Sequence, residues 1–512
     1  MNKNTSFVKN EPPNFKRCKT NQSPIEISDD EANPSYEKVK KTLIFDEGSV
    51  PLYLNQSKYE KFCPRKLEFK SFFNVYSKDH PKNIVWTIKD LLIASYVIEI
   101  DWIVNELKSQ VGENLLENLL FISHNEGKQN CTVYPKVDCF ISRNISEYFP
   151  KVKIPFGVFH SKFMLIHFEN LSDNSKSFMR FVITSANFIE SDWNQKSQSI
   201  WVQDFPKENK KQENKCEFKS YLIEFVESII STATLRKTWI GIIDKFDFTH
   251  ATAELIGSVP GYFNDQKEKF KWGHLRVKSL LDEIEKKKVN KAKEDNRGKL
   301  LMQFSSIGRI SKNWLFEEFS SSLVKSIKEP PQIVFPTVEQ VINSYEGIIG
   351  GASLPAKKMY IDKPWIRNLL YRWGNVDFNN PLNRLIPHIK TFLNYTVDND
   401  NVPKITWIIQ GSHNLSNAAW GKSQKETRFC IRNYELSVLI HKDKFDHLSL
   451  CGVFKDGFEY PRFTWCSRND INSDSTEDKP EFILKISLPF SLPPKPYSIE
   501  DCPWNIELLI DS

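Results

Sequence analysis

The chain has 512 residues, too many for a single hydrophobic core, so two domains or two fused halves are expected. Hydrophobic residues make up 40% and aromatic residues 13%, ample for burial, and the net charge of +6 fits either a polyanionic partner or an ordinary large soluble protein. Nine scattered cysteines without a Cys-x-x-Cys pair argue against a disulfide framework and indicate reduced thiols inside the cell. We expect no signal peptide, and the longest apolar stretch, near residues 91–98, is too short to span a bilayer.

The first 62 residues are rich in Asn, Lys, Ser, Glu and Pro, and we expect a disordered tail because they offer little apolar surface for burial. Basic clusters at Lys16–Lys19 and Lys38–Lys41 fit nuclear import signals, although a solvated tail explains each equally well. Ile25 and Ile27 precede an acidic run at 28–31, a pattern that could add a strand to a ubiquitin-like modifier.

Strands and helices are predicted to alternate from residue 63 onward. A helix with an acidic first turn is expected to open at residues 99–104, a strand at 119–123, and an amphipathic helix over 218–235. A first half at 63–272 and a second half at 273–512 show the same interleaving, which favours an α/β architecture made twice.

One short motif occurs once in each half. His160 and Lys162 stand two residues apart beside an apolar run that reads as a strand, and so do His388 and Lys390. Successive side chains of a strand alternate between its faces, so each His and Lys should project on the same side. A single His-x-Lys is expected by chance in a lysine-rich chain.

The residues downstream of each copy are more specific than the motif itself. Asn187 comes after the first lysine and Asn414 after the second at nearly the same distance, in Thr184–Asn187 and Gly411–Asn414. Each asparagine is followed by a tryptophan at the same spacing, Trp193 and Trp420 respectively. Packing alone does not require this coincidence, so the pattern indicates an internal repeat.

The repeated residue types are suited to chemistry at phosphorus. Lysine ammonium and asparagine amide groups donate hydrogen bonds to phosphate oxygens. One imidazole can attack phosphorus, and the other can protonate the leaving oxygen and then activate water. Two lysines facing one phosphoryl group can stabilise its charge without a metal ion, and no His, Asp or Glu cluster has metal-ligand spacing.

Other candidates are weaker. The small-residue loops at 305–308 and 350–355 could hold a phosphate through amides and hydroxyls, although many such turns bind nothing. His413 stands one residue before Asn414, where strand alternation turns it to the opposite face, so a structural role is favoured. The remaining histidines have no counterpart in the other half and receive no role.

With these residues the chain resembles the phospholipase D superfamily. Members usually carry an Asp five residues after the motif lysine, whereas this chain has His167 and Tyr395 there. Because both copies lack this Asp, the chain resembles one branch of the superfamily, the tyrosyl-DNA phosphodiesterases. Within that branch it resembles the fungal members. Further stretches resemble this branch: Phe156–Gly157, Asp192–Gln198, Trp272–His274, Gly350–Pro355, Pro387–Thr391, Asn414–Gly421, Arg432–Leu436 and Leu492–Pro494.

The resemblance implies a role for each matched position. His160 would be the nucleophile that forms a phosphohistidine, and His388 would be the general acid and then the general base. Gln198 and Glu435 would orient the two histidines. Phosphoryl oxygens would be bound by Lys162, Lys390, Asn187 and Asn414. Bound DNA would be contacted by Tyr96, Phe156, Ser306 and Ser353.

The resemblance also implies a function. The protein would be a DNA-repair phosphodiesterase that hydrolyses the 3′-phosphotyrosyl bond between DNA and a stalled topoisomerase, and other 3′ adducts, without a metal or other cofactor. It would act as a monomer in the nucleus, with a mitochondrial pool left open, and its two halves would share one active site about a pseudo-twofold axis. Two alternatives stay open: a phospholipase or phosphatidyl transferase of the same superfamily, and an inactive DNA-binding scaffold.

Overall fold

The computed structural model describes residues 52–59, 66–73, 86–111, 116–124, 132–133, 141–173, 176–208, 216–287, 298–325, 329–374, 381–397, 399, 403–424, 428–441, 462–465, 482–485 and 488–510. The basic clusters of the tail, Ile25 and Ile27 fall outside these residues. Residues Leu43–Ser512 belong to one unit, so the two halves are described together.

The first sheet is built from the earlier part of the chain. Within the described residues it has nine strands, in the order β2-β1-β10-β8-β7-β3-β4-β6-β5. Neighbouring strands are antiparallel from β1 across to β3 and parallel from β3 through β4 to β6. The strands are β1 Leu52–Asn55, β2 Lys66–Leu67, β3 Trp86–Ser95, β4 Leu116–Ser123, β5 Thr132–Val133, β6 Ser142–Tyr148, β7 Phe163–Asn170, β8 Ser177–Thr184 and β10 Ser199–Pro206.

The second sheet has the order β11-β21-β18-β17-β13-β14-β15, with β22 beside β18 and β23 beside β22. Neighbours are antiparallel from β11 across to β13 and parallel from β13 through β14 to β15. The strands are β11 Glu254–Ser258, β13 Lys299–Gln303, β14 Gln332–Val334, β15 Leu370–Tyr371, β17 Thr391–Val397, β18 Pro403–Gly411, β21 Glu435–His441, β22 Arg462–Trp465 and β23 Phe482–Lys485.

The two sheets repeat one topology. Strands β1, β10, β8, β7, β3, β4 and β6 of the first sheet correspond in order and direction to β11, β21, β18, β17, β13, β14 and β15 of the second. Each set also occurs in the same order along the chain. The first set runs from β1 to β10 and the second from β11 to β21, and in each set the first and last strands pair with each other. The predicted α/β architecture, made twice, is therefore confirmed.

The strand pairing places two boundaries earlier than the sequence analysis did. Because β11 is the counterpart of β1, the second repeat opens at Glu254, before the predicted boundary between residues 272 and 273. At the other end β1 pairs with β10 and β2, so the first sheet includes residues assigned to the tail of 1–62. Strand β11 is an edge strand, β1 has only the two-residue β2 outside it, and β21 and β10, with which they pair, are distant in sequence, so composition carries little sign of such pairing.

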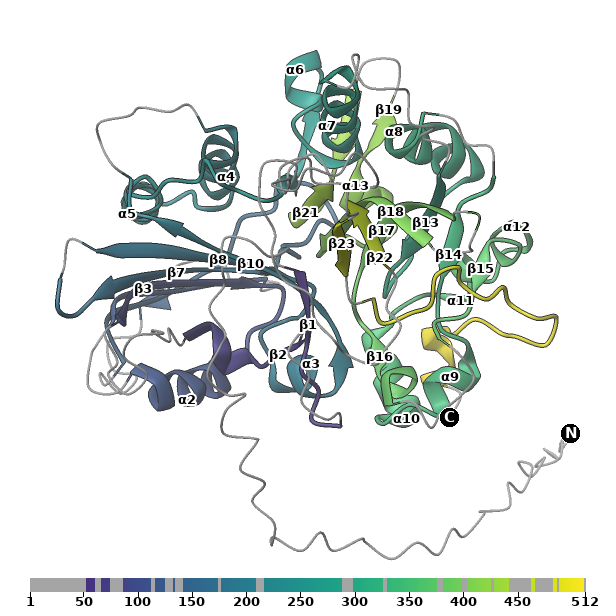
Figure 1. Ribbon diagram of the computed structural model, residues 1–512, viewed down its shortest axis with the longest axis horizontal. Helices are drawn as coiled ribbons and strands as arrows, with labels where there is room; N and C mark the ends of the chain where they lie inside the picture. The colour runs from purple at the N-terminus through teal and green to yellow at the C-terminus, as the bar shows by residue number, and fades with distance from the viewer. Residues whose placement is uncertain are drawn as a thin grey trace, which may run out of the picture. The chain divides into compact units, whose positions relative to one another are not determined.

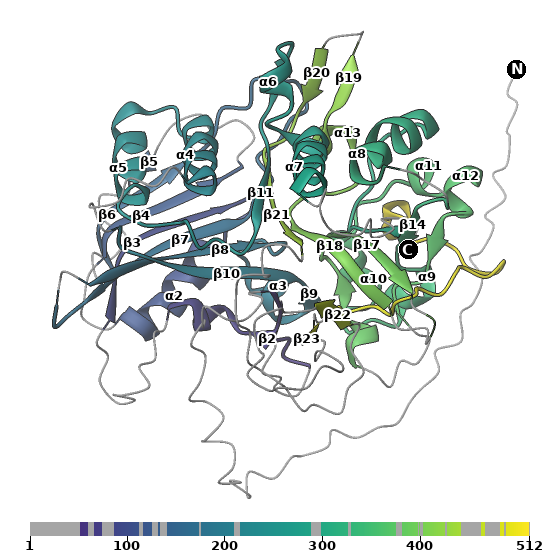
Figure 2. The ribbon, with the colours of Figure 1, turned by 45° about the horizontal axis from the view of Figure 1, so that its top comes forward.

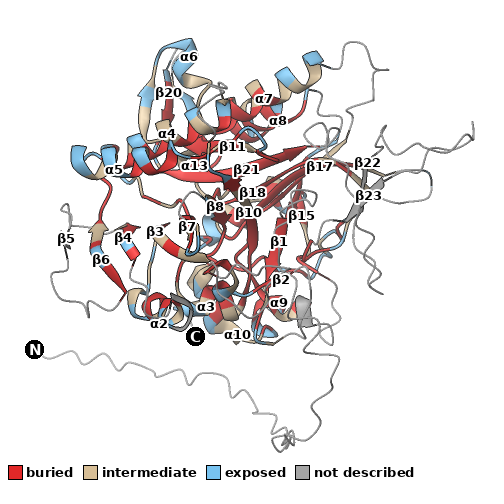
Figure 3. Cartoon of the chain, turned by 60° about the vertical axis from the view of Figure 1, so that its left-hand side comes forward, coloured by how far each residue is buried: buried red, intermediate tan, exposed pale blue. Residues whose placement is uncertain are grey.

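Strand β7 shows how the sheet is buried. Alternate residues Phe163 and Leu165 pack with α4 (Glu217–Ile229) and α5 (Ala233–Ile243), while Met164 and Ile166 pack with α2 (Ile100–Val111) on the opposite face. Figure 1 shows α4 and α5 on one side of β7, β8 and β10, and α2 on the other. The central strands are red in Figure 3, and burial on both faces explains the unbroken apolar run Phe163–Ile166 at the start of β7.

The helix predicted at 218–235 is two helices, α4 and α5. The chain leaves helical geometry at Ile230, whose backbone is extended with φ −93° and ψ 104°. The next amide, Ser231 N, donates to Tyr148 Oη at 2.8 Å. A hydrogen bond to a distant side chain thus replaces the helical hydrogen bond. The apolar periodicity of the sequence could not predict this break between the two helices.

The second sheet is covered by α7 (Gly273–Lys287), whose Val277 and Leu280 pack against Ile256 of β11, as Figure 2 shows for the two elements. No helix in the described ranges is long and apolar enough to cross a membrane. The other helical segments are α3 Glu190–Asn194, α6 Gln266–Lys269, α8 Ser321–Leu323, α9 Val338–Ile342, α10 Gly347–Gly350, α11 Lys358–Ile361, α12 Pro364–Arg367, α13 Asn417–Trp420, the 3₁₀ turns η1 Phe69–Phe73, η3 Gly351–Ser353, η4 Pro381–Arg384 and η6 Ile506–Leu509, and the π-helix η2 Trp314–Ser320. The remaining strands are β9 Lys196–Ser197, β12 Gly261–Phe263, β16 Ile386–Pro387, β19 Lys422–Gln424 and β20 Arg428–Ile431.

Candidate active site

The repeated motifs occupy equivalent places in the two sheets. The first His-x-Lys pair lies directly before β7 and the second directly before β17. Asn187 follows β8, and Asn414 follows β18. Gln198 lies directly before β10 and Glu435 opens β21, so these two residues are counterparts as well. In each sheet the three strands run antiparallel to their neighbours. The start of β7, the end of β8 and the start of β10 therefore lie side by side, and so do the start of β17, the end of β18 and the start of β21. We call each of these places the edge of its sheet.

The two edges are joined by main-chain pairing between the halves. In the first contact, Phe159 bridges Tyr434, and His160 N donates to Tyr434 O at 2.9 Å. In the second, β16 pairs with β9 in parallel, and Ile389 N donates to Ser197 O at 2.8 Å. Each histidine of one half is therefore held by the segment that carries Gln198 or Glu435 of the other half.

His160 is held by a carboxylate. Its Nδ1 lies 2.8 Å from Glu435 Oε2, which also accepts a hydrogen bond from Ser412 Oγ at 2.6 Å. Burial alone would raise the pKa of Glu435, but the charge of His160 and its hydrogen bond lower that pKa to about 2. Burial, and then the charge of Lys162, lower the pKa of His160 to about 4, although Glu435 opposes the shift. At neutral pH an ionised carboxylate therefore faces a neutral imidazole, so Nδ1 carries the proton and Nε2 keeps its lone pair.

His388 is held by a neutral amide instead. Gln198 places Nε2 at 3.0 Å and Oε1 at 3.2 Å from His388 Nδ1, and Ser185 Oγ donates to that Oε1 at 2.7 Å. An amide can donate to an unprotonated ring nitrogen and accept from a protonated one. Burial, followed by the charge of Lys390, pushes the pKa of His388 well below its ordinary value. The two histidines thus differ in the side chain closest to Nδ1, which is a carboxylate for His160 and an amide for His388.

Both motif lysines are buried, with exposed fractions of 0% for Lys162 and 1% for Lys390. Lys162 Nζ donates to His160 O at 2.7 Å, and Lys390 Nζ donates to His388 O and lies 3.3 Å from both ring nitrogens of His388. Burial lowers the pKa of Lys162 to about 7, and burial together with the charge of Lys162 holds the pKa of Lys390 well below its ordinary value. Two buried ammonium groups that repel each other would be stabilised by an anion between them.

The two asparagines are held in different ways. Asn414 Oδ1 accepts from the amides of Ser305 and Ser306 at 3.1 and 3.0 Å, which leaves its Nδ2 hydrogens for another partner. Asn187 accepts from Ser95 Oγ at 3.3 Å and donates through Nδ2 to Asp192 Oδ2 at 2.9 Å. The loop at 305–308 therefore uses two of its amides to orient an asparagine, and the Ser306 hydroxyl is the group it can still offer to a phosphate.

Two charged residues to which the sequence analysis gave no role lie beside the site. Asp192 and Lys196 are buried, with exposed fractions of 2% and 3%, and their side chains form an ion pair at 2.9 Å. Asp192 Oδ2 also lies 3.5 Å from His388 Nδ1. In the sequence, Asp192 differs from the repeat only in that Ala419 stands at the corresponding place, five residues after Asn414.

The residues predicted to contact DNA are partly or fully exposed. Tyr96 stacks on His124 at 5.2 Å between ring centres, and Lys162 Nζ lies 5.8 Å from its ring. Phe156 is 90% exposed and has φ 61°, a left-handed conformation that is rare for a residue with a large side chain. Ser353 is half-buried at the end of η3. His413 is buried between Ser258 and Ser437, as its structural interpretation requires.

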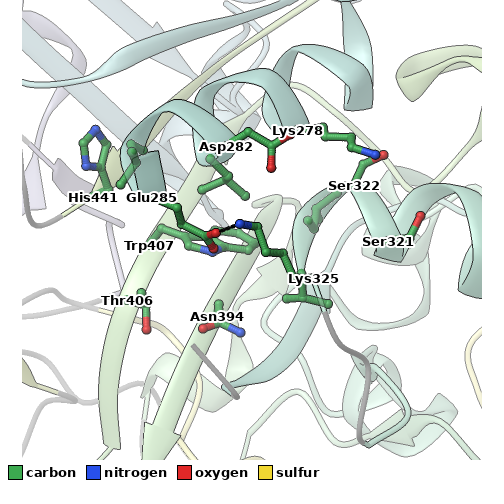
Figure 4. Close-up of a pocket in the computed structure, with 14 residues that line it drawn as sticks. Lys278, Asp282, Glu285, Ser321, Ser322, Lys325, Asn394, Thr406, Trp407 and His441 are labelled. Carbon is green, nitrogen blue, oxygen red and sulfur yellow. Dashed lines mark ion pairs between the residues drawn. The ribbon is translucent and has the colours of Figure 1, made fainter. Parts of the chain in front are cut away.

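No group of three or more His, Cys, Asp or Glu side chains in the described part of the chain is arranged to hold a metal ion. A cavity of about 380 Å³ lies elsewhere, between α7, α8 and strands β17 and β18, and Figure 4 shows its lining. Lys325 and Glu285 form an ion pair there. None of the motif residues lines it, so this cavity is separate from the His-x-Lys site.

Two topologically equal α/β halves that bring two His-x-Lys pairs and two asparagines to one joint edge define a phospholipase D-like phosphodiesterase. The sequence model of the family described as "Tyrosyl-DNA phosphodiesterase" matches residues 81–498. The chain belongs to the tyrosyl-DNA phosphodiesterase family and is an enzyme of the phosphodiesterase class, which decides against the phospholipase alternative.

Individual relatives agree. The chain is 31% identical to tyrosyl-DNA phosphodiesterase 1 of Arabidopsis thaliana over 491 residues, covering 87% of this chain and 76% of that protein. It is 30% identical to tyrosyl-DNA phosphodiesterase 1 of Drosophila melanogaster over 389 residues, covering 70% of this chain and 59% of that protein. A crystal structure of the yeast tyrosyl-DNA phosphodiesterase matches with a TM-score of 0.60 at 18% identity, covering 89% of this chain and 99% of that one, which supports the fold.

Proposed function

We propose that this protein repairs DNA by hydrolysing the 3′-phosphotyrosyl bond that joins a DNA strand to a stalled topoisomerase, and other 3′ adducts, through a covalent phosphohistidine. The observation that carries the proposal is the unequal support of the two histidines. His160 lies on the ionised carboxylate of Glu435 at 2.8 Å, whereas His388 lies on the neutral amide of Gln198. A carboxylate suits a nucleophile whose phosphorylated form is cationic, and an amide, which can donate or accept, suits a histidine that gains and loses a proton.

In the first step His160 Nε2 attacks phosphorus and the bond from phosphorus to the tyrosine oxygen breaks. The phosphorylated imidazole is cationic, and its remaining N–H, on Nδ1, stays hydrogen bonded to Glu435 Oε2, so the carboxylate stabilises the intermediate. His388, when it carries a proton, gives that proton to the departing phenolate oxygen. The leaving tyrosine is a phenol with a pKa near 10, so this help is modest in size.

In the second step His388, now neutral, takes a proton from water, and the hydroxide attacks the phosphohistidine. The phosphorus–nitrogen bond breaks, His160 is released, and a 3′-phosphate end remains on the DNA. Because the Gln198 amide has a donor and an acceptor within reach of His388 Nδ1, it can remain hydrogen bonded to either protonation state.

The phosphoryl oxygens are held by Lys162, Lys390 and the amide hydrogens of Asn187 and Asn414. The buried ammonium groups supply the positive charge that a metal ion supplies in other phosphoryl transfer enzymes. The protein should therefore act in the absence of any divalent cation or other cofactor.

The DNA strand is held mainly through its phosphates, with stacking as a supplement. Phe156 supports this because an exposed aromatic ring on a strained backbone has little structural reason to be there. Lys151 and Lys153 are exposed on the same segment and can meet phosphates. Tyr96, Ser306 and Ser353 complete the proposed strand contacts, which favour a single-stranded or frayed 3′ end.

We make three further proposals, two about the tail and one about the assembly state. The basic clusters direct the protein to the nucleus, Ile25 and Ile27 contact a ubiquitin-like modifier, and the enzyme works as a monomer. A fluorescent fusion with and without residues 1–50 tests the first. Titration of a labelled tail peptide with the modifier tests the second, and light scattering tests the third.

The decisive experiment is incubation of the protein with a labelled 3′-phosphotyrosyl oligonucleotide in EDTA, followed by denaturing gel electrophoresis. We expect conversion to a 3′-phosphate end, no conversion by His160→Ala, and full conversion by His250→Ala, which changes an exposed histidine away from the site. Activity that disappears in EDTA and returns with Mg²⁺ would refute the metal-independent mechanism. Activity in His160→Ala would refute the assignment of the nucleophile.

A further inference from the structure

Asp192 is a buried carboxylate that contacts residues of both halves of the site. It stands in α3, and its Oδ2 accepts from Asn187 N at 2.8 Å and from Asn187 Nδ2 at 2.9 Å. The same oxygen lies 3.5 Å from Nδ1 of His388. One carboxylate oxygen therefore touches both a phosphate-binding amide of the first half and the acid–base histidine of the second.

The other oxygen of Asp192 is paired inside the protein. Oδ1 accepts from Lys196 Nζ at 2.9 Å, and that Nζ lies 3.8 Å from Glu346 Oε1. Burial alone would raise the pKa of Asp192, but the charges of His388 and Lys196 hold that pKa well below its ordinary value. Asp192 is therefore ionised throughout the working pH range, and its negative charge is fixed in place.

His388 faces mostly positive charge. Lys390 lies 3.3 Å from its ring nitrogens, and the charges of Lys196 and Lys162 also disfavour its protonation. Asp192 is the carboxylate that opposes them. Without it, three lysines and a neutral amide would surround a histidine that has to carry a proton to the leaving group.

We propose that Asp192 is a positioning residue that favours the protonated form of His388 in the first chemical step while it holds the Asn187 amide toward the phosphate. This inference rests on the proposed function and extends it to a residue outside the repeated motif. The second half has Ala419 at the corresponding place, so the device exists on one side only. That asymmetry fits two histidines with different tasks, since Glu435 already serves His160.

The test compares two leaving groups in full-length Asp192→Asn. A 3′-phosphotyrosyl oligonucleotide needs acid help, whereas a 3′-(4-nitrophenyl phosphate) oligonucleotide releases a far weaker base and does not. An opposite charge at this distance favours the charged form by about one pKa unit or more, so the single-turnover rate on the tyrosyl substrate should fall about tenfold or more. The nitrophenyl rate should fall much less, and the alkaline limb of kcat on the tyrosyl substrate should move about one unit to lower pH.

Two further variants separate this role from a structural one. Asp192→Asn leaves Lys196 without its close partner, so the double variant Asp192→Asn with Lys196→Met removes both charges and protects the fold. It should show a preference for the nitrophenyl substrate in the same direction but smaller, because one lysine that disfavours protonation of His388 is also gone. Glu346→Gln, which touches Lys196 but not His388, should behave like the wild type. Equal losses on both substrates, with an unchanged pH profile, would overturn the proposal.

A measurement without turnover keeps this inference distinct from the proposed function. NMR titration of His388 in histidine-labelled protein, with inorganic phosphate bound, should give a pKa about one unit lower in Asp192→Asn than in the wild type. If the wild type does not cleave the tyrosyl substrate but the titration shifts, the proposed substrate is wrong and the Asp192 inference stands. An identical titration in both proteins would refute the inference whatever the activity.

Discussion

Replacing Glu435 by Gln should stop the nucleophile from acting without changing the size of any side chain. Glu435 Oε2 faces His160 Nδ1 and accepts from Ser412 Oγ, while Oε1 accepts from Asn433 Nδ2 at 3.1 Å. An amide can supply an oxygen at only one of these two places. If its oxygen faces Asn433, its NH₂ group faces His160 and Ser412, and if it is turned round, two NH₂ groups meet at Asn433.

The magnitude can be worked out from the tautomer. With an NH₂ group opposite Nδ1, His160 is driven to carry its proton on Nε2, which then has no lone pair for phosphorus. The cationic phosphohistidine also loses the carboxylate that stabilises it. Loss of a tautomer-fixing carboxylate in an acyl transfer triad costs about 10⁴-fold, and lost acid–base assistance costs about 10²–10⁴-fold, so we expect a fall in that range.

The assay is single-turnover cleavage of a 3′-phosphotyrosyl oligonucleotide, with the formation of covalent enzyme–DNA monitored on a denaturing gel. Glu339→Gln, an exposed change in α9, is the matched control and should retain the wild-type rate. Circular dichroism and thermal unfolding would confirm that Glu435→Gln is folded. A folded variant within about tenfold of the wild-type rate would refute the tautomer argument, because that loss lies below the range expected.

The other predictions concern the acid–base histidine, the lysine charge and the tail. His388→Arg should accumulate covalent enzyme–DNA on a denaturing gel, since the second step should slow by about 10²–10⁴-fold while phenolate departs with little help; no adduct in this folded variant would argue against a covalent route. The pKa of about 7 for Lys162 predicts that the affinity for a non-hydrolysable 3′-phosphonate ester, measured by fluorescence anisotropy, falls as the pH rises through 7. Lys162→Arg stays charged and should flatten this pH profile. Parallel profiles for the two proteins would contradict this. Deletion of residues 1–50 should leave kcat unchanged, whereas deletion through residue 60 removes β1 and should lower it, because Asn55 Oδ1 accepts from Gln198 N at 2.8 Å.

The repeated motif could be recognised in the sequence because its residues are close together in the chain. His160 and Lys162 are two residues apart beside a strand, and strand alternation fixes their common direction whatever the rest of the fold does. The recurrence of the spacing to Asn187 and Asn414 then locates β7, β8, β17 and β18 together, since each motif sits at a strand end. The α/β halves can be inferred from the same pattern.

The features that sequence did not reveal depend on contacts between distant segments. The pairing of β1 with β10, and of β11 with β21, is made by main-chain groups that every residue type carries, so no composition signals it. The role proposed for Asp192 depends on α3 bringing its carboxylate to His388, a residue of the other half. A single Asp between Ser191 and Trp193 looks like any helix-start residue until that neighbour is known.

The crossed support of the two histidines bears on how such a chain could have arisen. Gln198 and Glu435 occupy the same place in the two repeats, and each reaches the histidine of the opposite repeat. A homodimer of a single ancestral repeat would have the same crossed contacts with one residue type at both places, and its two histidines would be chemically indistinguishable. Duplication and fusion of the gene remove that constraint, because each copy can then mutate alone. Under the proposed mechanism, a carboxylate on one side and an amide on the other give the reaction a direction that a symmetric homodimer would lack.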